Sequence, residues 1–121
     1  MQKSILDRIT LELSVEIINL IKSLPATILN NNICSQLIRS GTSVGANYRE
    51  ATESESRPDF IHKCAIAKKE VKETIYWLSL LLEIHQNHAK KITSLIEKCE
   101  DLIRIFGASI ATSKRNLPTK S

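Results

Sequence analysis

Apolar residues recur along the chain at steps of three and four, the period of a helix that buries one face. Four segments carry this pattern, and short polar stretches separate them. The third segment is the most regular, with these positions on one stripe: Phe60, Cys64, Ala67, Val71, Thr74, Leu78, Leu81 and His85. We therefore expect four helices, spanning about residues 4–24, 31–54, 57–86 and 89–113.

Turn residues support these boundaries. Pro25 and Pro58 lie between apolar segments, and we predict Ser4 and Ser56 as the N-caps of the first and third helices. An asparagine of the run NNN at residues 30–32 offers the cap of the second. Because each connection is only a few residues long, successive helices must turn back on one another. The pattern predicts an all-α, antiparallel, up-down-up-down four-helix bundle.

Length and composition agree with one domain. The chain has 121 residues, of which 42% are hydrophobic and 4% aromatic, so its core is built mainly from aliphatic side chains. We expect the bundle to occupy residues 1–113 and a polar basic tail to follow at 114–121. The cysteines Cys34, Cys64 and Cys99 fall in or beside apolar stripes, which is typical of core residues in a reducing compartment.

Membrane and secretion signals are missing from the pattern. No run of about 18 apolar residues could span a membrane, and the first residues lack the basic, apolar and small-residue order of a signal peptide. We expect a cytoplasmic protein that does not enter a membrane.

The stretch SGTSVGAN at residues 40–47 is unusual for a helix interior. Each glycine costs about 1 kcal/mol relative to alanine, so packing from outside the helix must compensate. Small residues let a facing helix approach closely. A polar stripe through the same segment is either solvated or buried against a helix or another subunit, and we favour burial. The residues predicted for this helix-packing or oligomer seam are Ser40, Gly41, Ser43, Gly45, Ala46, Asn47 and Glu50.

The formal net charge is +4, and charges balance over the first 88 residues. The basic excess lies in the last quarter, where it either attracts nucleic acid or complements a helix dipole. Lysines of the third helix either form a solvated face or make a basic ridge that oligomerisation would multiply. The candidate nucleic-acid-binding residues are Arg39, Arg49, Lys68, Lys69, Lys72, Lys114 and Arg115.

No arrangement of residues indicates catalysis. His85 and His88 lie one turn apart without a matching carboxylate pair, so we predict no metal site. SGTSVG lacks the preceding strand and the lysine of a phosphate-binding loop, and no serine or cysteine lies in a nucleophile motif. We expect no catalytic residues, no cofactor and no enzymatic activity.

Three segments carry a family resemblance: QLIRSGTSVGANYREA at residues 36–51, DFIHKCAIAKKEVKETIYWLSLL at 59–81 and CEDLIRIF at 99–106. They resemble the four-helix-bundle proteins encoded by intervening sequences within bacterial 23S ribosomal RNA genes. The resemblance implies a left-handed bundle that assembles as a homopentamer, with no established enzymatic activity. That family is also similar to the accessory protein of diversity-generating retroelements, a basic pentameric barrel that associates with reverse transcriptase and nucleic acid.

Together these features lead to two hypotheses. The first is a non-enzymatic, oligomeric helical protein that binds RNA, DNA or a nucleoprotein partner, reverse-transcriptase-like or ribosomal, through basic surface residues. The alternative is a protein–protein interaction adaptor or scaffold that does not bind nucleic acid.

Overall fold

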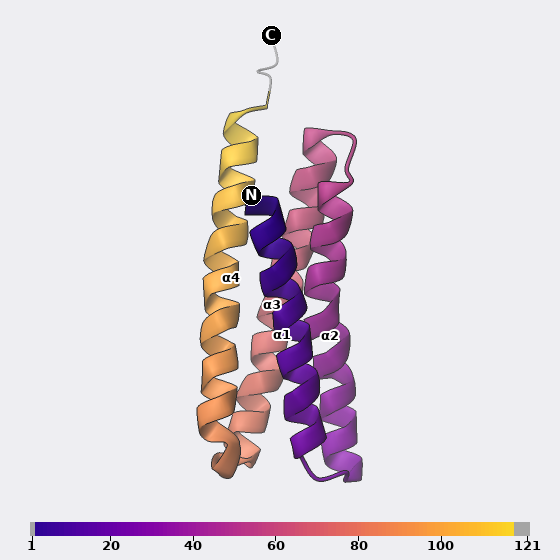
Figure 1. The fold of residues 1–121 in the computed structure, drawn as a ribbon, viewed down its shortest axis with the longest axis vertical. Helices are drawn as coiled ribbons and strands as arrows, with labels where there is room; N and C mark the ends of the chain where they lie inside the picture. Colours follow the sequence, from indigo (N-terminus) through magenta and orange to yellow (C-terminus); the bar gives the residue numbers. More distant parts are fainter. Residues whose placement is uncertain (1, 118–121) are drawn as a thin grey trace.

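Four long helices account for most of the structure, a computed structural model that describes residues 2–117, with side chains from Ile5 onward (Figure 1). They are α1 (Gln2–Ser23), α2 (Ile28–Thr52), α3 (Arg57–Ile84) and α4 (Ala89–Arg115), with the short 3₁₀ turn η1 (Gln86–His88) before α4. No strand occurs among these residues. The prediction of an all-α fold with four helices is confirmed.

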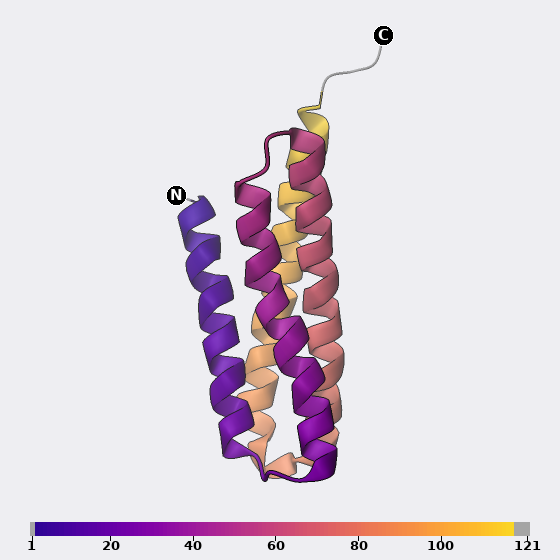
Figure 2. The same ribbon diagram turned by 90° about the vertical axis from the view of Figure 1, so that its right-hand side faces the viewer.

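Each helix runs antiparallel to the next, which confirms the up-down-up-down topology (Figures 1 and 2). The packing of α3 against α2 and α4 is the most extensive in the bundle. In contrast, α1 packs mainly on α2 and makes few contacts with α4. One outer edge of α1 therefore lies at the periphery of the bundle.

The core follows the predicted stripes. On α3 the buried positions are Cys64, Ala67, Val71, Thr74, Leu78 and Leu81, whereas the two ends of the predicted stripe, Phe60 and His85, are half-buried. The three cysteines are buried and unbridged, which confirms their prediction as core residues.

Helix starts show where local signals succeed and fail. The Ser56 hydroxyl accepts a hydrogen bond from the Asp59 backbone N–H at 3.2 Å, so the predicted cap of α3 is confirmed. The predicted Ser4 cap is wrong, because α1 begins at Gln2 and Ser4 lies within it. The asparagine cap of α2 is also wrong, because Thr27 accepts a hydrogen bond from the Asn30 backbone N–H at 3.1 Å.

The side chain of Asn30 is used in tertiary contacts instead. Its amide donates to the Pro25 carbonyl at 2.9 Å, and its Oδ1 lies 2.9 Å from Nε2 of His85. Since Oδ1 can only accept, Nε2 of His85 is the donor in this hydrogen bond. These bonds tie the α1–α2 connection to the end of α3, and a side chain so engaged cannot also cap its own helix.

At the other terminus, α4 continues two residues beyond its expected end. Lys114 and Arg115 therefore belong to its last turn rather than to a separate tail. Residues 118–121 of the predicted tail, including Lys120, lie outside the described residues.

Candidate functional site

The small-residue stretch of α2 is helical throughout and packs against α1 of the same chain. A β-carbon on Gly41 would lie 2.5 Å from Cδ1 of Ile17, and one on Gly45 would lie 3.1 Å from Oγ1 of Thr10. The Ser14 hydroxyl also donates to the Gly41 carbonyl at 3.3 Å. Close approach of α1 therefore offsets the poor helix propensity of this segment.

On the opposite side of the same stretch, Ser40 faces α3. The Thr74 hydroxyl lies 3.0 Å from Ser40 Oγ and 2.8 Å from the Glu70 carbonyl of its own helix, and the Ser40 hydroxyl donates to the Leu37 carbonyl at 3.2 Å. Both hydroxyls are fully buried. The contact between them favours one axial position of α2 relative to α3, because sliding either helix would separate the two hydroxyls and leave each with only a carbonyl of its own helix.

The other members of the predicted seam are less enclosed. Ser43 and Asn47 are half-buried, and each side chain donates to a carbonyl of its own helix. Ala46 and Glu50 are exposed. Within one chain, these residues lie on the surface beside the α2–α3 and α1–α2 contacts, and their burial against another subunit stays a prediction.

An open groove runs between α1 and α2 beside the glycines, with a volume of about 340 Å³. Leu11 lines this groove from α1, and Thr42 and Ala46 line it from α2. Leu11 is 60% exposed and the nearby Val15 is 47% exposed. The groove therefore presents apolar and small side chains to solvent, and Asp7 and Arg49 also line it.

Ion pairs between α2 and α3 engage one candidate cation, Arg39, and also Lys63, which was not a candidate. The Arg39 guanidinium contacts Glu70 at 3.5 Å and also pairs with Glu73, both on α3. A 2.8 Å bond joins Lys63 Nζ to Glu50, and this hydrogen bond raises the pKa of Lys63. These pairs join α2 to α3 and neutralise the charges involved.

In contrast, Lys68, Lys69 and Lys72 have no ion-pair partner within the described part of the chain. The ammonium of Lys68 lies over the backbone of α4, 3.6 Å from the place a β-carbon on Gly107 would occupy. Lys72 follows Lys68 by one turn, and Lys69 lies beside them, so three cations share the outer α3 surface beside α4.

The remaining candidate cations lie elsewhere. Arg49 borders the α1–α2 groove, and Lys114 and Arg115 are exposed in the last turn of α4. The Arg115 guanidinium donates to the Thr112 hydroxyl at 3.2 Å. The candidate residues therefore form separate groups, of which only the three lysines of α3 make a dense one.

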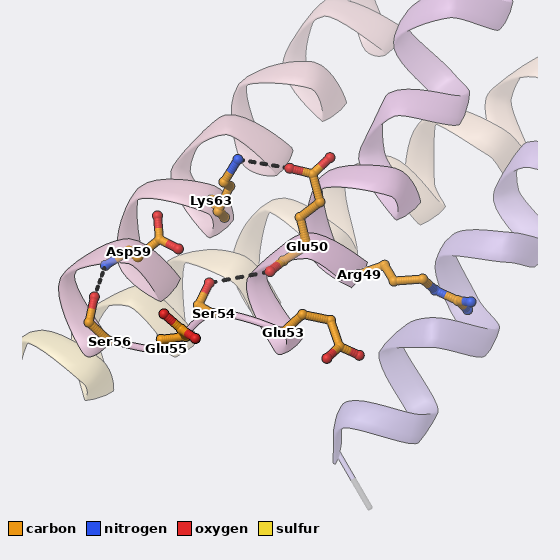
Figure 3. Close-up of a pocket in the computed structure, with 8 residues that line it drawn as sticks. All are labelled: Arg49, Glu50, Glu53, Ser54, Glu55, Ser56, Asp59 and Lys63. Atoms are coloured by element: carbon orange, nitrogen blue, oxygen red, sulfur yellow. Dashed lines mark hydrogen bonds and ion pairs between the residues drawn. The ribbon is translucent and has the colours of Figure 1, made fainter.

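A pocket of about 610 Å³ lies at the α2–α3 turn and was not predicted from the sequence (Figure 3). Its carboxylates are Glu50, Glu53, Glu55 and Asp59, whereas its cations are Arg49 and Lys63. Figure 3 shows the Arg49 side chain extending towards α1 and away from the acidic group. The alternating ESES of residues 53–56 was the available sequence signal. A net negative pocket repels phosphate, so this end is a poor place for nucleic acid.

Two kinds of chemistry find little support in the geometry. Burial raises the pKa of Cys64 to about 11 and that of Cys99 to about 12, so these thiols stay protonated and weakly nucleophilic near neutral pH. Among the described residues, no three His, Cys, Asp or Glu side chains are grouped to hold a metal ion.

None of the helices described here combines the length and apolar character needed to cross a membrane.

Comparisons with known proteins identify the family. Residues 3–108 match the family described as 23S rRNA-intervening sequence protein. The fold is similar to the crystal structure of a protein with unknown function from the S23 ribosomal protein family of Bacteroides thetaiotaomicron, with a TM-score of 0.77 and 35% sequence identity. That match covers 87% of this chain and 97% of the other. No curated protein matches the sequence. Because the family match spans most of the chain, the protein belongs to the 23S rRNA-intervening sequence protein family.

Proposed function

We propose that this protein is a non-enzymatic homo-oligomer that binds RNA, alone or in a nucleoprotein, through the outer surface of α3. The observation that carries the proposal is the group of three lysines, Lys68, Lys69 and Lys72, without ion-pair partners in the described residues. Binding to phosphate releases counterions from the nucleic acid, so unpaired lysines on an open surface favour such a partner.

Assembly would increase the density of this charge. A single chain carries +4, which is modest for nonspecific binding. The homopentamer implied by the family resemblance would carry about +20, with five copies of the lysine group on one particle. The exposed apolar side chains of Leu11, which lines the α1–α2 groove, and of the nearby Val15 support assembly, because such surfaces commonly contact another subunit.

The test reverses the lysine charges. The variant Lys68→Glu/Lys69→Glu/Lys72→Glu should lose most of its affinity for RNA, measured by fluorescence anisotropy over a salt series. Loss of three phosphate contacts should also make the salt dependence shallower by about two units of the log–log slope.

A matched control carries the same charge change at one end of the bundle, whereas the three lysines lie in the middle of α3. Lys22, Lys90 and Lys91 are exposed where α1 ends and α4 begins, so Lys22→Glu/Lys90→Glu/Lys91→Glu changes the net charge equally. The proposal requires the α3 variant to bind much more weakly than this control. Equal losses would mean that net charge alone governs binding, and undiminished binding by the α3 variant would exclude this surface.

The alternative function is a protein–protein adaptor without nucleic-acid binding, and the same exposed Leu11 and Val15 favour it. The partner would be a reverse-transcriptase-like or ribosomal protein, as the resemblance implies. If the protein is an adaptor, the α3 charge reversal should leave partner binding intact, whereas replacing Leu11 and Val15 should abolish it. Measuring partner capture by the α3 variant and by the Leu11 and Val15 variant side by side separates the two functions.

A further inference from the structure

An exposed aromatic side chain continues the lysine stripe of α3. Tyr76 is 61% exposed, whereas the other large apolar side chains of α3, apart from Ile84, are buried or half-buried. It follows Lys72 by four residues and Lys69 by seven, which places it about 6 Å and about 10.5 Å further along the same helix face. The three side chains therefore form one outward stripe with an aromatic ring at its end.

The Tyr76 ring is supported by its neighbour. Its centroid lies 5.0 Å from that of Trp77, and the two rings meet edge to face at 78°. The Trp77 indole is half-buried and packs against the core. Its N–H donates to Glu73 at 3.2 Å, and Glu73 pairs with Arg39 on α2. A satisfied, anchored indole limits the freedom of the exposed ring beside it.

The charges around Tyr76 favour an anionic ligand. Lys69 and Lys72 lack ion-pair partners among the described residues, as shown above. Glu73 lies next to the stripe and shares the single Arg39 guanidinium with Glu70, so its charge is offset only in part. The exposed Glu83 lies seven residues beyond Tyr76 on the same face, about 10.5 Å along the helix. Phosphate groups on the Lys69 and Lys72 side of the ring would therefore meet two lysines and one partly neutralised carboxylate.

We propose that Tyr76 is a stacking platform for an unpaired base of single-stranded RNA or DNA, with Lys69 and Lys72 contacting the adjoining phosphates. The inference rests on the proposed nucleic-acid binding and specifies the form of nucleic acid. A base in a duplex is already stacked on its neighbours and offers only phosphates to this surface, whereas a single strand can place a base on the ring.

The experiment compares an oligouridylate of about twelve nucleotides with a duplex RNA of the same length. Tyr76→Ala should bind the single strand about 5–100-fold more weakly, the range that one stacked base contributes, and should bind the duplex as the unchanged protein does. Tyr76→Phe retains the aromatic face and should keep its affinity. Ile84→Ala is the matched control, because it removes a 42% exposed apolar side chain from the end of α3 away from the lysines.

Trp77 gives a direct signal, because it is the only tryptophan in the chain. A base stacked on Tyr76 lies beside the indole, so the oligouridylate should quench tryptophan fluorescence and the duplex should not. Tyr76→Ala should remove this difference between the two ligands.

Other results separate this inference from the proposed function. If Tyr76→Ala weakens binding of both RNAs equally, or of neither, the platform is wrong while phosphate binding by the lysines stands. A lower oligomer mass of Tyr76→Ala in light scattering would show that the ring is a subunit contact, and this also overturns the platform. If the unchanged protein binds neither RNA at low salt, the proposed function is wrong and the platform falls with it.

Discussion

Cδ1 of Ile17 on α1 occupies the space beside Gly41 on α2, where a β-carbon would lie only 2.5 Å from it. Ile17 is fully buried, so its terminal methyl group has little room to move. The separation of α1 and α2 at this level therefore depends on glycine. A residue that weakens an isolated helix is what allows these two helices to pack.

This contact predicts that the effect of Gly41→Ala on the free energy of unfolding changes sign with the residue at position 17. Gly41→Ala should destabilise the protein by about 1–2 kcal/mol, because overpacking outweighs the gain in helix propensity of about 1 kcal/mol. Ile17→Val removes Cδ1, and the next Ile17 atoms lie 3.7 and 3.8 Å from the new β-carbon, which is ordinary contact. In that background Gly41→Ala should stabilise by up to about 1 kcal/mol. Urea unfolding followed by circular dichroism measures all four proteins, and an equal cost in both backgrounds would contradict the account.

The buried hydroxyl pair predicts a coupling between α2 and α3. Ser40→Ala and Thr74→Val should each cost about 1 kcal/mol, while the double variant should cost less than their sum by about 0.5–1.5 kcal/mol. Thr42→Ala is the control, since Thr42 is exposed and its hydroxyl donates only to carbonyls of its own helix. Additive costs in the double-mutant cycle would show that the bond between the two hydroxyls contributes nothing.

The exposed apolar side chains of Leu11 in the α1–α2 groove and of the nearby Val15 predict the effect of polar substitutions on assembly. Leu11→Asn and Val15→Asn should lower the oligomer mass in light scattering because they place amides in the proposed contact. Both side chains are largely exposed in the single chain, so the fold of the subunit should survive. Ile28→Asn changes a side chain that is 84% exposed and does not line the groove, and it should leave the mass unchanged. An unaltered mass in the first two variants would exclude the surface around Leu11 and Val15 as a subunit contact.

The Leu11 and Val15 substitutions test a subunit contact more directly than a large side chain at position 45 would. A side chain there would first meet Thr10 of the same subunit, at 3.1 Å from its β-carbon, and would disturb the α1–α2 packing directly. We still expect Gly45→Leu to disrupt close helix packing. Its effect on mass alone, however, would not distinguish a subunit contact from damage within the bundle.

Burial of Cys99 predicts a loss of stability at alkaline pH. Burial raises its pKa from 9.0 to about 12, so the folded protein holds the thiol proton after the unfolded chain has released it. Since the folded state then binds more protons, the free energy of unfolding must fall as pH rises above about 9. Cys99 should contribute to this fall mainly between about pH 9 and 12, where the unfolded chain has released the thiol proton and the folded protein still holds it. Urea unfolding in reducing buffer should show a shallower pH dependence for Cys99→Ala, and an unchanged slope would refute the assignment.

Much of the fold was predictable because its signals are local. The heptad-like stripe of α3 marks buried positions through spacing alone, and Ser56 caps that helix through atoms only three residues apart. Caps of the other helices were less predictable. Asn30 has the right chemistry for a cap, but its amide is engaged by Pro25 and His85, and that competition arises only after folding.

The sequence showed which residue types the candidate site contains, but it showed much less of how their side chains are arranged and which of them are ion-paired. Arg39 and Lys68 read alike in the sequence, as cations on neighbouring helices. In the structure Arg39 faces two carboxylates of α3, whereas Lys68 lies over Gly107 of α4. Which cation is neutralised depends on the rotation and height of one helix against another, and a single helix pattern does not contain either quantity.

The sequence by itself determined four helices, their order and their buried faces, because periodicity and short connections act over a few residues. It also required that residues 40–47 be stabilised from outside their helix. Only the tertiary structure decided that α1 packs against Gly41 and that Thr74 bonds to Ser40. It also decided that Arg39 pairs with Glu70 and Glu73 of α3, while Lys69 and Lys72 have no ion-pair partner among the described residues. The physical reason is that steric fit and ion pairing depend on atoms from different helices, whose relative positions exist only once the bundle has formed.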